Sequence, residues 1–199
     1  FGDDSTLLVD GVNNKIVGAV DTASLTVSST NVAIGNSAGE TTQGVQAVSL
    51  GARAGQTTQG NNATAIGADA GNSSQGANAT AIGGGSAQVS QGEGAVAIGY
   101  LAGETTQGAS SVAIGKEAGL TSQGTESVAI GLLAGKLNQG SQTIAIGSEA
   151  GRDDQGANGI ALGHESGLAD QAEFGIAIGE KAGRINQGIR GIGIGRSSG

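Results

Sequence analysis

The sequence predicts an all-β fold, a parallel β-solenoid of ten 16-residue turns, and three observations support this prediction. The first is a tandem repeat: the segment that begins Asn31-Val-Ala-Ile-Gly35 recurs every 16 residues, without one insertion, as far as Gly191. The second is glycine at fixed places in the repeat. The third is composition, because 40 of the 199 residues are Gly, none is Pro, Cys, Met or Trp, and only Tyr100 and two Phe are aromatic. A mixed globular core of this length normally contains more large side chains.

The repeat divides the chain into two parts. Residues 31–190 hold ten full repeats and residues 191–199 begin an eleventh. Residues 1–30 do not follow the repeat, and their apolar runs at 6–9, 15–17 and 25–27 predict short strands with turns between them. We expect this segment to be an N-terminal β cap, or a joint to an upstream fibre segment, because a stacked sheet exposes an unpaired edge at its end. Since the chain stops within a repeat at Gly199, we also expect the native solenoid to continue or to stack on another copy.

Each repeat opens with a predicted strand at positions 2 to 4, counted from Asn31 as position 1. Position 2 is Val, Ile or Thr, position 4 is Ile or Leu, and position 3 is Ala except at Ser49 and Gly193. Alternate residues of a strand point to opposite faces. We expect the aliphatic side chains to form the core and the small residue to face a close contact with another chain. A 16-residue coil buries little apolar surface, whereas ordering its backbone costs conformational entropy at every residue. A single coil would therefore be unstable, so oligomerisation is favoured.

Two further positions are constant and predict structural roles. Position 5 is glycine in every copy, as expected for a corner with an unusual backbone conformation or a close backbone approach. These glycines are Gly35, Gly51, Gly67, Gly83, Gly99, Gly115, Gly131, Gly147, Gly163, Gly179 and Gly195. Position 13 is glutamine in every full copy, and we expect its amide to bond to turn backbone or to an inter-chain axis, and to form a ladder along the rod. These glutamines are Gln43, Gln59, Gln75, Gln91, Gln107, Gln123, Gln139, Gln155, Gln171 and Gln187.

Several segments carry a resemblance to known fibre proteins. The segments 31–35, 111–115 and 127–131, which read Asn- or Ser-Val-Ala-Ile-Gly, resemble the head repeat of trimeric autotransporter adhesins. That resemblance implies a left-handed parallel β-roll with three chains packed about one axis. The family's usual repeat is shorter, so one corner must be longer here. The longer form, with Ala38-Gly39 and Gln43-Gly44, looks like repeats in fibre proteins of bacteriophages and large algal viruses.

Positions 11 and 12 carry many hydroxyl side chains, as in Thr41-Thr42, Thr57-Thr58 and Thr105-Thr106. Position 12 is always small and polar, which favours turns. The paired threonines are similar to the flat threonine arrays of ice-binding solenoids. The array ends after residue 122, and the structural interpretation is preferred at this point.

No catalytic, cofactor-binding or metal-binding residues are predicted. His164 lies at a variable position, and the repeat fixes no oriented base beside it. Asp153-Asp154 lacks the glycine-rich remainder of a calcium-binding β-roll motif. The nine basic residues are scattered in a chain of formal net charge −8, which argues against nucleic acid as a partner. No apolar run has the length of a membrane helix.

The sequence thus favours a non-enzymatic protein, the structural shaft of an attachment fibre or adhesin on a cell or virion surface. Its expected partner is itself, as a homotrimer, and a host-surface receptor would contact variable corners such as Tyr100-Leu101 and Leu132-Leu133. The alternative is a self-assembling extracellular filament without receptor binding.

Overall fold

The computed structural model describes residues 9–10, 15–16 and 31–199. Strands β1 (Val9–Asp10) and β2 (Lys15–Ile16) pair antiparallel, with Val9 opposite Ile16. β1 overlaps the predicted strand at 6–9 only at Val9, and β2 lies within the predicted strand at 15–17. The predicted strand at 25–27, the predicted turns and the capping role of residues 1–30 lie outside the described residues.

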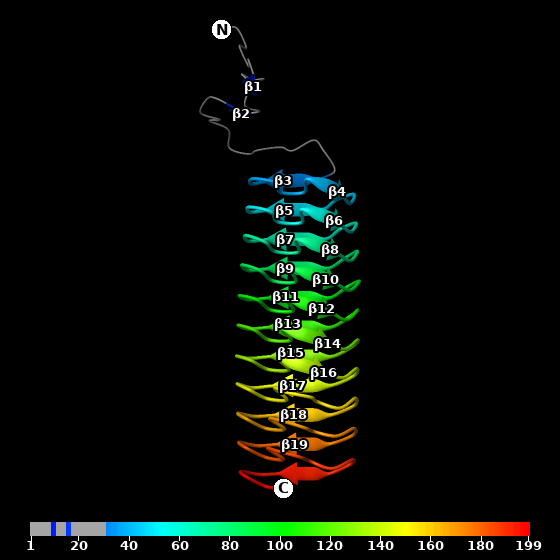
Figure 1. Ribbon diagram of the computed structural model, residues 1–199, viewed down its shortest axis with the longest axis vertical. Helices are drawn as coiled ribbons and strands as arrows, with labels where there is room; N and C mark the ends of the chain where they lie inside the picture. Colours follow the sequence, from blue (N-terminus) through cyan, green and yellow to red (C-terminus); the bar gives the residue numbers. More distant parts are fainter. Residues whose placement is uncertain (1–8, 11–14, 17–30) are drawn as a thin grey trace, which may run out of the picture.

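From residue 31 the chain is a parallel β-solenoid of about ten turns of 16 residues, as predicted. Each turn, called a rung below, contributes a strand to one sheet, and the strands stack along a single axis (Figure 1). Pairing joins each residue to the residue 16 positions later, as in Val112 opposite Val128. The repeat length therefore sets the register of the whole rod, whose ten full rungs at the β-strand spacing span roughly 48 Å.

The larger sheet has eleven parallel strands, one from each repeat, at positions 2 to 4. They are β3 (Val32–Ile34), β5 (Val48–Leu50), β7 (Thr64–Ile66), β9 (Thr80–Ile82), β11 (Val96–Ile98), β13 (Val112–Ile114), β15 (Val128–Ile130), β17 (Ile144–Ile146), β18 (Ile160–Leu162), β19 (Ile176–Ile178) and β20 (Ile192–Ile194).

A second sheet, of seven parallel strands, lies at positions 11 to 13 of the first seven rungs. Its strands are β4 (Thr41–Gln43), β6 (Thr57–Gln59), β8 (Ser73–Gln75), β10 (Val89–Gln91), β12 (Thr105–Gln107), β14 (Thr121–Gln123) and β16 (Leu137–Gln139). Single parallel bridges continue the pairing through Asp153, Ala169 and Ile185. The sequence did not predict this second strand, because its middle residue is a turn-forming type.

The predicted assignment of the core was wrong, because the small residue of the first strand points inward and the large ones point outward. Ala113 is fully buried, whereas Val112 and Ile114 on either side of it remain partly exposed. The interior is a stack of alanines from positions 1, 3 and 8, together with the position 13 glutamines. A coil of 16 residues is too narrow to hold two layers of Val and Ile side chains, so these occupy the outer face.

The corners use backbone conformations that L-residues seldom adopt. Thirty non-glycine residues of the described chain have positive φ, at positions 7, 12 and 16 of the rungs and at Ala87. Even the β-branched Thr58 and Thr106 have φ of 55° and 57°. Such residues are strained in isolation, so the stacked ladder must hold them in place.

Candidate functional site

The glutamines at position 13 cross the interior and join the two sheets. In all ten full rungs the Nε2 atom donates to the carbonyl oxygen of the position 2 residue, at 2.8–3.1 Å. Gln123, for example, is 2% exposed and donates to Val112 at 2.8 Å. Each rung therefore contains one polar cross-brace between its two strands, in an interior where a lost hydrogen bond is costly.

The same amides also connect successive rungs, but not everywhere. Axial Nε2-to-Oε1 bonds of 3.0–3.3 Å join Gln59 to Gln75, Gln91 to Gln107, and the run from Gln139 through Gln155 and Gln171 to Gln187. At the first rungs, the hydroxyl of Ser49 relays the contact: Gln43 donates to it at 3.3 Å and it donates to Gln59 at 2.8 Å.

Three links of this amide ladder are open. The Oε1 atoms of Gln91, Gln123 and Gln139 are buried and accept no hydrogen bond within the described chain. The Gln91 amide lies in the rung of Ala87, the only position 9 residue that is not glycine. In the other full rungs a Cβ at position 9 would approach the glutamine amide closely; at Gly119 it would lie 2.8 Å from Oε1 of Gln123. Glycine at position 9 thus leaves room for the glutamine amide, although the rung of Ala87 also keeps its brace, from Gln91 to Thr80 at 2.9 Å.

The position 5 glycines permit the close stacking of rungs. At Gly115, φ is +127° and a Cβ would lie 2.5 Å from the carbonyl oxygen of Gly131 in the next rung. The same contact, at 2.3–2.8 Å, recurs at every position 5 glycine from Gly35 to Gly179. The two sets of predicted site residues therefore lie in different places: the glutamines fill the interior, and the glycines form a stacked corner beside the eleven-stranded sheet.

The outer face of the eleven-stranded sheet, here called the aliphatic face, carries two rows of large apolar side chains. The rows run the length of the sheet because residues of the same type stack in register, as with Val112 on Val128 and Ile114 on Ile130. Within the rod most of these side chains are partly covered by their neighbours; away from the two ends of the sheet the most exposed are Ile144 at 38% and Leu162 at 41%. At position 2 the aliphatic row is interrupted only by Thr64 and Thr80. The sequence signal for this face was present, but its direction was assigned inward.

The seven-stranded sheet presents a different outer face, of hydroxyl groups. Positions 11 and 12 are exposed or half-exposed in each strand, while position 13 is turned inward. Because the position 13 amides reach the other sheet, the hydroxyl face and the aliphatic face lie on opposite sides of the coil.

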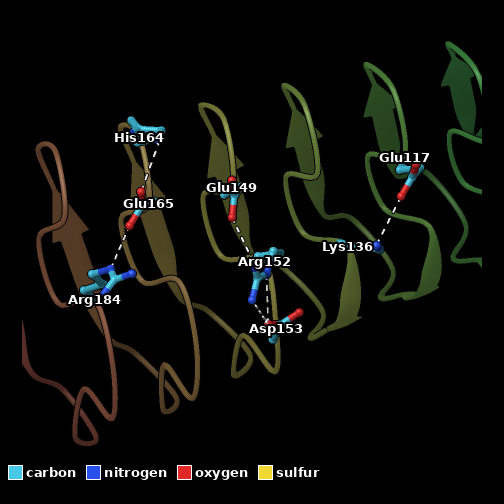
Figure 2. Close-up of polar contacts among 8 residues, drawn as sticks. All are labelled: Glu117, Lys136, Glu149, Arg152, Asp153, His164, Glu165 and Arg184. Atoms are coloured by element: carbon cyan, nitrogen blue, oxygen red, sulfur yellow. Dashed lines mark hydrogen bonds and ion pairs between the residues drawn. The ribbon is translucent and has the colours of Figure 1, made fainter.

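One corner, between the aliphatic face and the seven-stranded sheet, carries ion pairs in the C-terminal half (Figure 2). Lys136 contacts Glu117 at 3.1 Å, and Arg184 contacts Glu165 at 2.7 Å, each pair joining position 7 of one rung to position 10 of the next. The hydrogen bond from Lys136 holds the pKa of Glu117 below its ordinary value, and the bond from Arg184 does the same for the pKa of Glu165. These pairs are solvent-accessible and link neighbouring rungs.

A third ion-pair group on this corner lies within one rung, where Arg152 contacts both Glu149 and Asp153 at 2.8 Å (Figure 2). His164 is half-exposed, and its Nε2 atom lies 3.4 Å from a carboxylate oxygen of Glu165. The described residues contain no cluster of three or more His, Cys, Asp and Glu side chains that could hold a metal ion.

The apolar corner residues are exposed to different degrees. Tyr100 and Leu132 expose 58% and 46% of their surface, whereas Leu101 and Leu133 beside them are half-buried. In the part of the chain that the structure describes, no helix is long and apolar enough to cross a membrane. Comparison with known proteins returned no matching family model, no matching curated protein and no matching solved structure.

Proposed function

We propose that this chain is the structural shaft of an extracellular or virion attachment fibre, assembled as a homotrimer of left-handed coils around the aliphatic face. The observation that carries this proposal is the aliphatic face itself. It extends over eleven strands, and its side chains remain partly exposed in the single chain. Contiguous apolar surface of this length is typical of a protein–protein interface.

The symmetry of the face favours copies of the same chain as its partner. Nine of the eleven strands present two aliphatic side chains at the same spacing, and Thr64 and Thr80 are the exceptions, so an identical rod in parallel register offers matching ridges along most of its length. Three such faces turned toward one axis would bury both rows. The hydroxyl face, the charged corner and the exposed Tyr100 and Leu132 would then lie on the outside, where a host-surface receptor could reach them.

A non-catalytic role agrees with the way the constant positions are used. The position 13 glutamines brace the interior and the position 5 glycines allow the rungs to stack, so both of these constant positions have a structural explanation. The second candidate is a self-assembling extracellular filament without receptor binding, which uses the same rod joined end to end.

Sedimentation equilibrium of the full chain tests the assembly. We expect a mass three times the 18.9 kDa of one chain, independent of concentration in the micromolar range. Val112→Glu should shift the mass to that of one chain, because it places a charge within the interface, where burial without a partner is costly. Thr121→Glu is the matched control: it lies in β14 on the opposite face and should leave the mass unchanged.

Electron microscopy of the same samples separates the two candidates. Discrete rods of uniform length support the fibre shaft, whereas polymers that lengthen with concentration support the filament. A chain that stays monomeric at all concentrations, or a Val112→Glu variant that assembles like the parent chain, contradicts the trimer.

A further inference from the structure

The hydroxyl face is a regular two-row array that the shaft proposal does not use. Over the six strands β4, β6, β8, β10, β12 and β14, eleven of the twelve outward residues at positions 11 and 12 are Thr or Ser, and Val89 is the exception. The outward residues are Thr41, Thr42, Thr57, Thr58, Ser73, Ser74, Val89, Ser90, Thr105, Thr106, Thr121 and Ser122. None of them is charged. The array stops at β16, where Leu137 and Asn138 occupy these positions, and the acidic pair Asp153-Asp154 follows.

The backbone fixes the spacing of these hydroxyl groups. Thr41 pairs with Thr57, Thr57 with Ser73, and Thr105 with Thr121, all in parallel register. Each row therefore repeats at the strand spacing of about 4.8 Å. The Gln59 and Gln107 amides directly behind the array are 2% exposed and bonded to the facing sheet, so the face rests on a braced interior. Little conformational freedom remains to be lost when such a surface binds.

A face of this kind selects the type of ligand that can bind to it. A small solute needs a concave site that encloses most of its surface, and a face of exposed and half-exposed side chains offers none. A hydroxyl group also gains little when it exchanges one water molecule for one isolated partner. Many weak contacts become effective only when the partner is itself periodic and rigid, because the entropy of association is then lost once for the whole array.

From this we infer that the hydroxyl face binds ice. Ice presents rows of oxygen atoms at a spacing close to the strand spacing, and each one can donate and accept hydrogen bonds, as a threonine or serine hydroxyl can. The threonine methyl groups, and Val89 with them, add apolar contact between the hydroxyl groups without introducing charge. This inference is independent of the shaft proposal, because the hydroxyl face lies opposite the aliphatic face and stays exposed whether or not the chain assembles.

Ice-affinity partitioning of the full chain, with ice grown slowly from buffer, tests the inference. The parent chain should be enriched in the ice fraction and should inhibit ice recrystallisation. Thr57→Lys and Thr105→Lys each raise a charged side chain above the array, and both variants should lose enrichment and inhibition. The matched control is Thr125→Lys, which changes an exposed threonine at a corner outside the array. It should retain both activities, and circular dichroism of all variants verifies that the solenoid is intact.

Three outcomes would overturn the inference. The first is exclusion of the parent chain from ice. The second is retention of activity in the two array variants. The third is binding to crystalline cellulose or chitin without enrichment in ice, which would assign the array to a solid polysaccharide.

Discussion

Replacing Gly115 by alanine should separate two rungs of the solenoid. The new Cβ would lie 2.5 Å from the carbonyl oxygen of Gly131 and 2.8 Å from its carbonyl carbon. Both atoms belong to backbone, so no side-chain rotation relieves the overlap. The residue would also have to adopt φ of +127°, which L-residues rarely do.

The expected loss of stability is large for one methyl group. An unfavourable backbone conformation costs on the order of 1–3 kcal/mol. The steric overlap adds to this because the rungs must move apart, and forced overpacking costs roughly 1–3 kcal/mol more. A total of about 3 kcal/mol would lower the Tm by roughly 6–12 °C in a chain of this size. In a one-dimensional array the damage should concentrate at the altered interface between rungs.

Thermal unfolding at a fixed protein concentration measures the effect, and hydrogen exchange of residues 111–135 shows whether the opening is local. Gly84→Ala is the matched control, since its Cβ would meet nothing closer than 3.7 Å, at Tyr100, and Ala52 and Ala68 already occupy this position. The control should melt within about 2 °C of the parent chain. If Gly115→Ala melts together with the control, the stacked-corner explanation is refuted.

Three other perturbations test the interior and the corners. Gln123→Ala removes a brace and leaves a cavity, so it should lower the free energy of unfolding, measured by chemical denaturation, by about 2–4 kcal/mol. The same change at the partly exposed Gln56 is the control and should lower it by under about 1 kcal/mol. Ala87→Gly removes the strain of an alanine with a φ of +45°, which should stabilise the fold by roughly 1 kcal/mol and raise the Tm by a few degrees. A lower Tm would contradict the strain argument. The pKa of Glu117 is lowered by Lys136, so its contribution to stability is present above pH of about 4.5 and declines as pH falls through the lowered pKa. A pH series of melting temperatures should therefore fall less steeply in acid for Lys136→Met than for the parent chain, and parallel curves would count against this ion pair.

The repeat length and the glycine corners could be predicted from sequence because both depend on spacing alone. A period of 16 without insertions leaves one register for stacking, and the structure has this register from Val32 to Ile194. Spacing alone does not determine which side of the strand faces inward. Alternation of large and small residues, as in Val112-Ala113-Ile114, is compatible with either side being buried. The width of the coil decides between them, and width depends on how far apart the two sheets lie.

The second sheet was missed for a related reason. The segment Thr105-Thr106-Gln107 contains a residue of positive φ in the middle of a strand, whereas strand prediction assumes extended residues throughout. Small polar residues followed by glycine are also typical of turns. The signal that could have identified this strand was the constant glutamine. One large amide per turn, at a fixed position, needs an acceptor on a facing strand to which it can donate.

The identical stacking of rungs has a consequence for the length of the molecule. Each rung contacts its neighbours through the same backbone pairing, so removing residues 95–110 as a block would place Ser111 after Gly94. The strands that follow would then pair with the strands of the preceding rungs in the same register. The rod would be shorter by one strand spacing, about 4.8 Å, with its faces still aligned. Deleting any number of residues other than 16 or a multiple of it would turn the following side chains away from their stacks. Such a chain can be lengthened or shortened only by whole repeats, so the number of repeats determines the length of the rod.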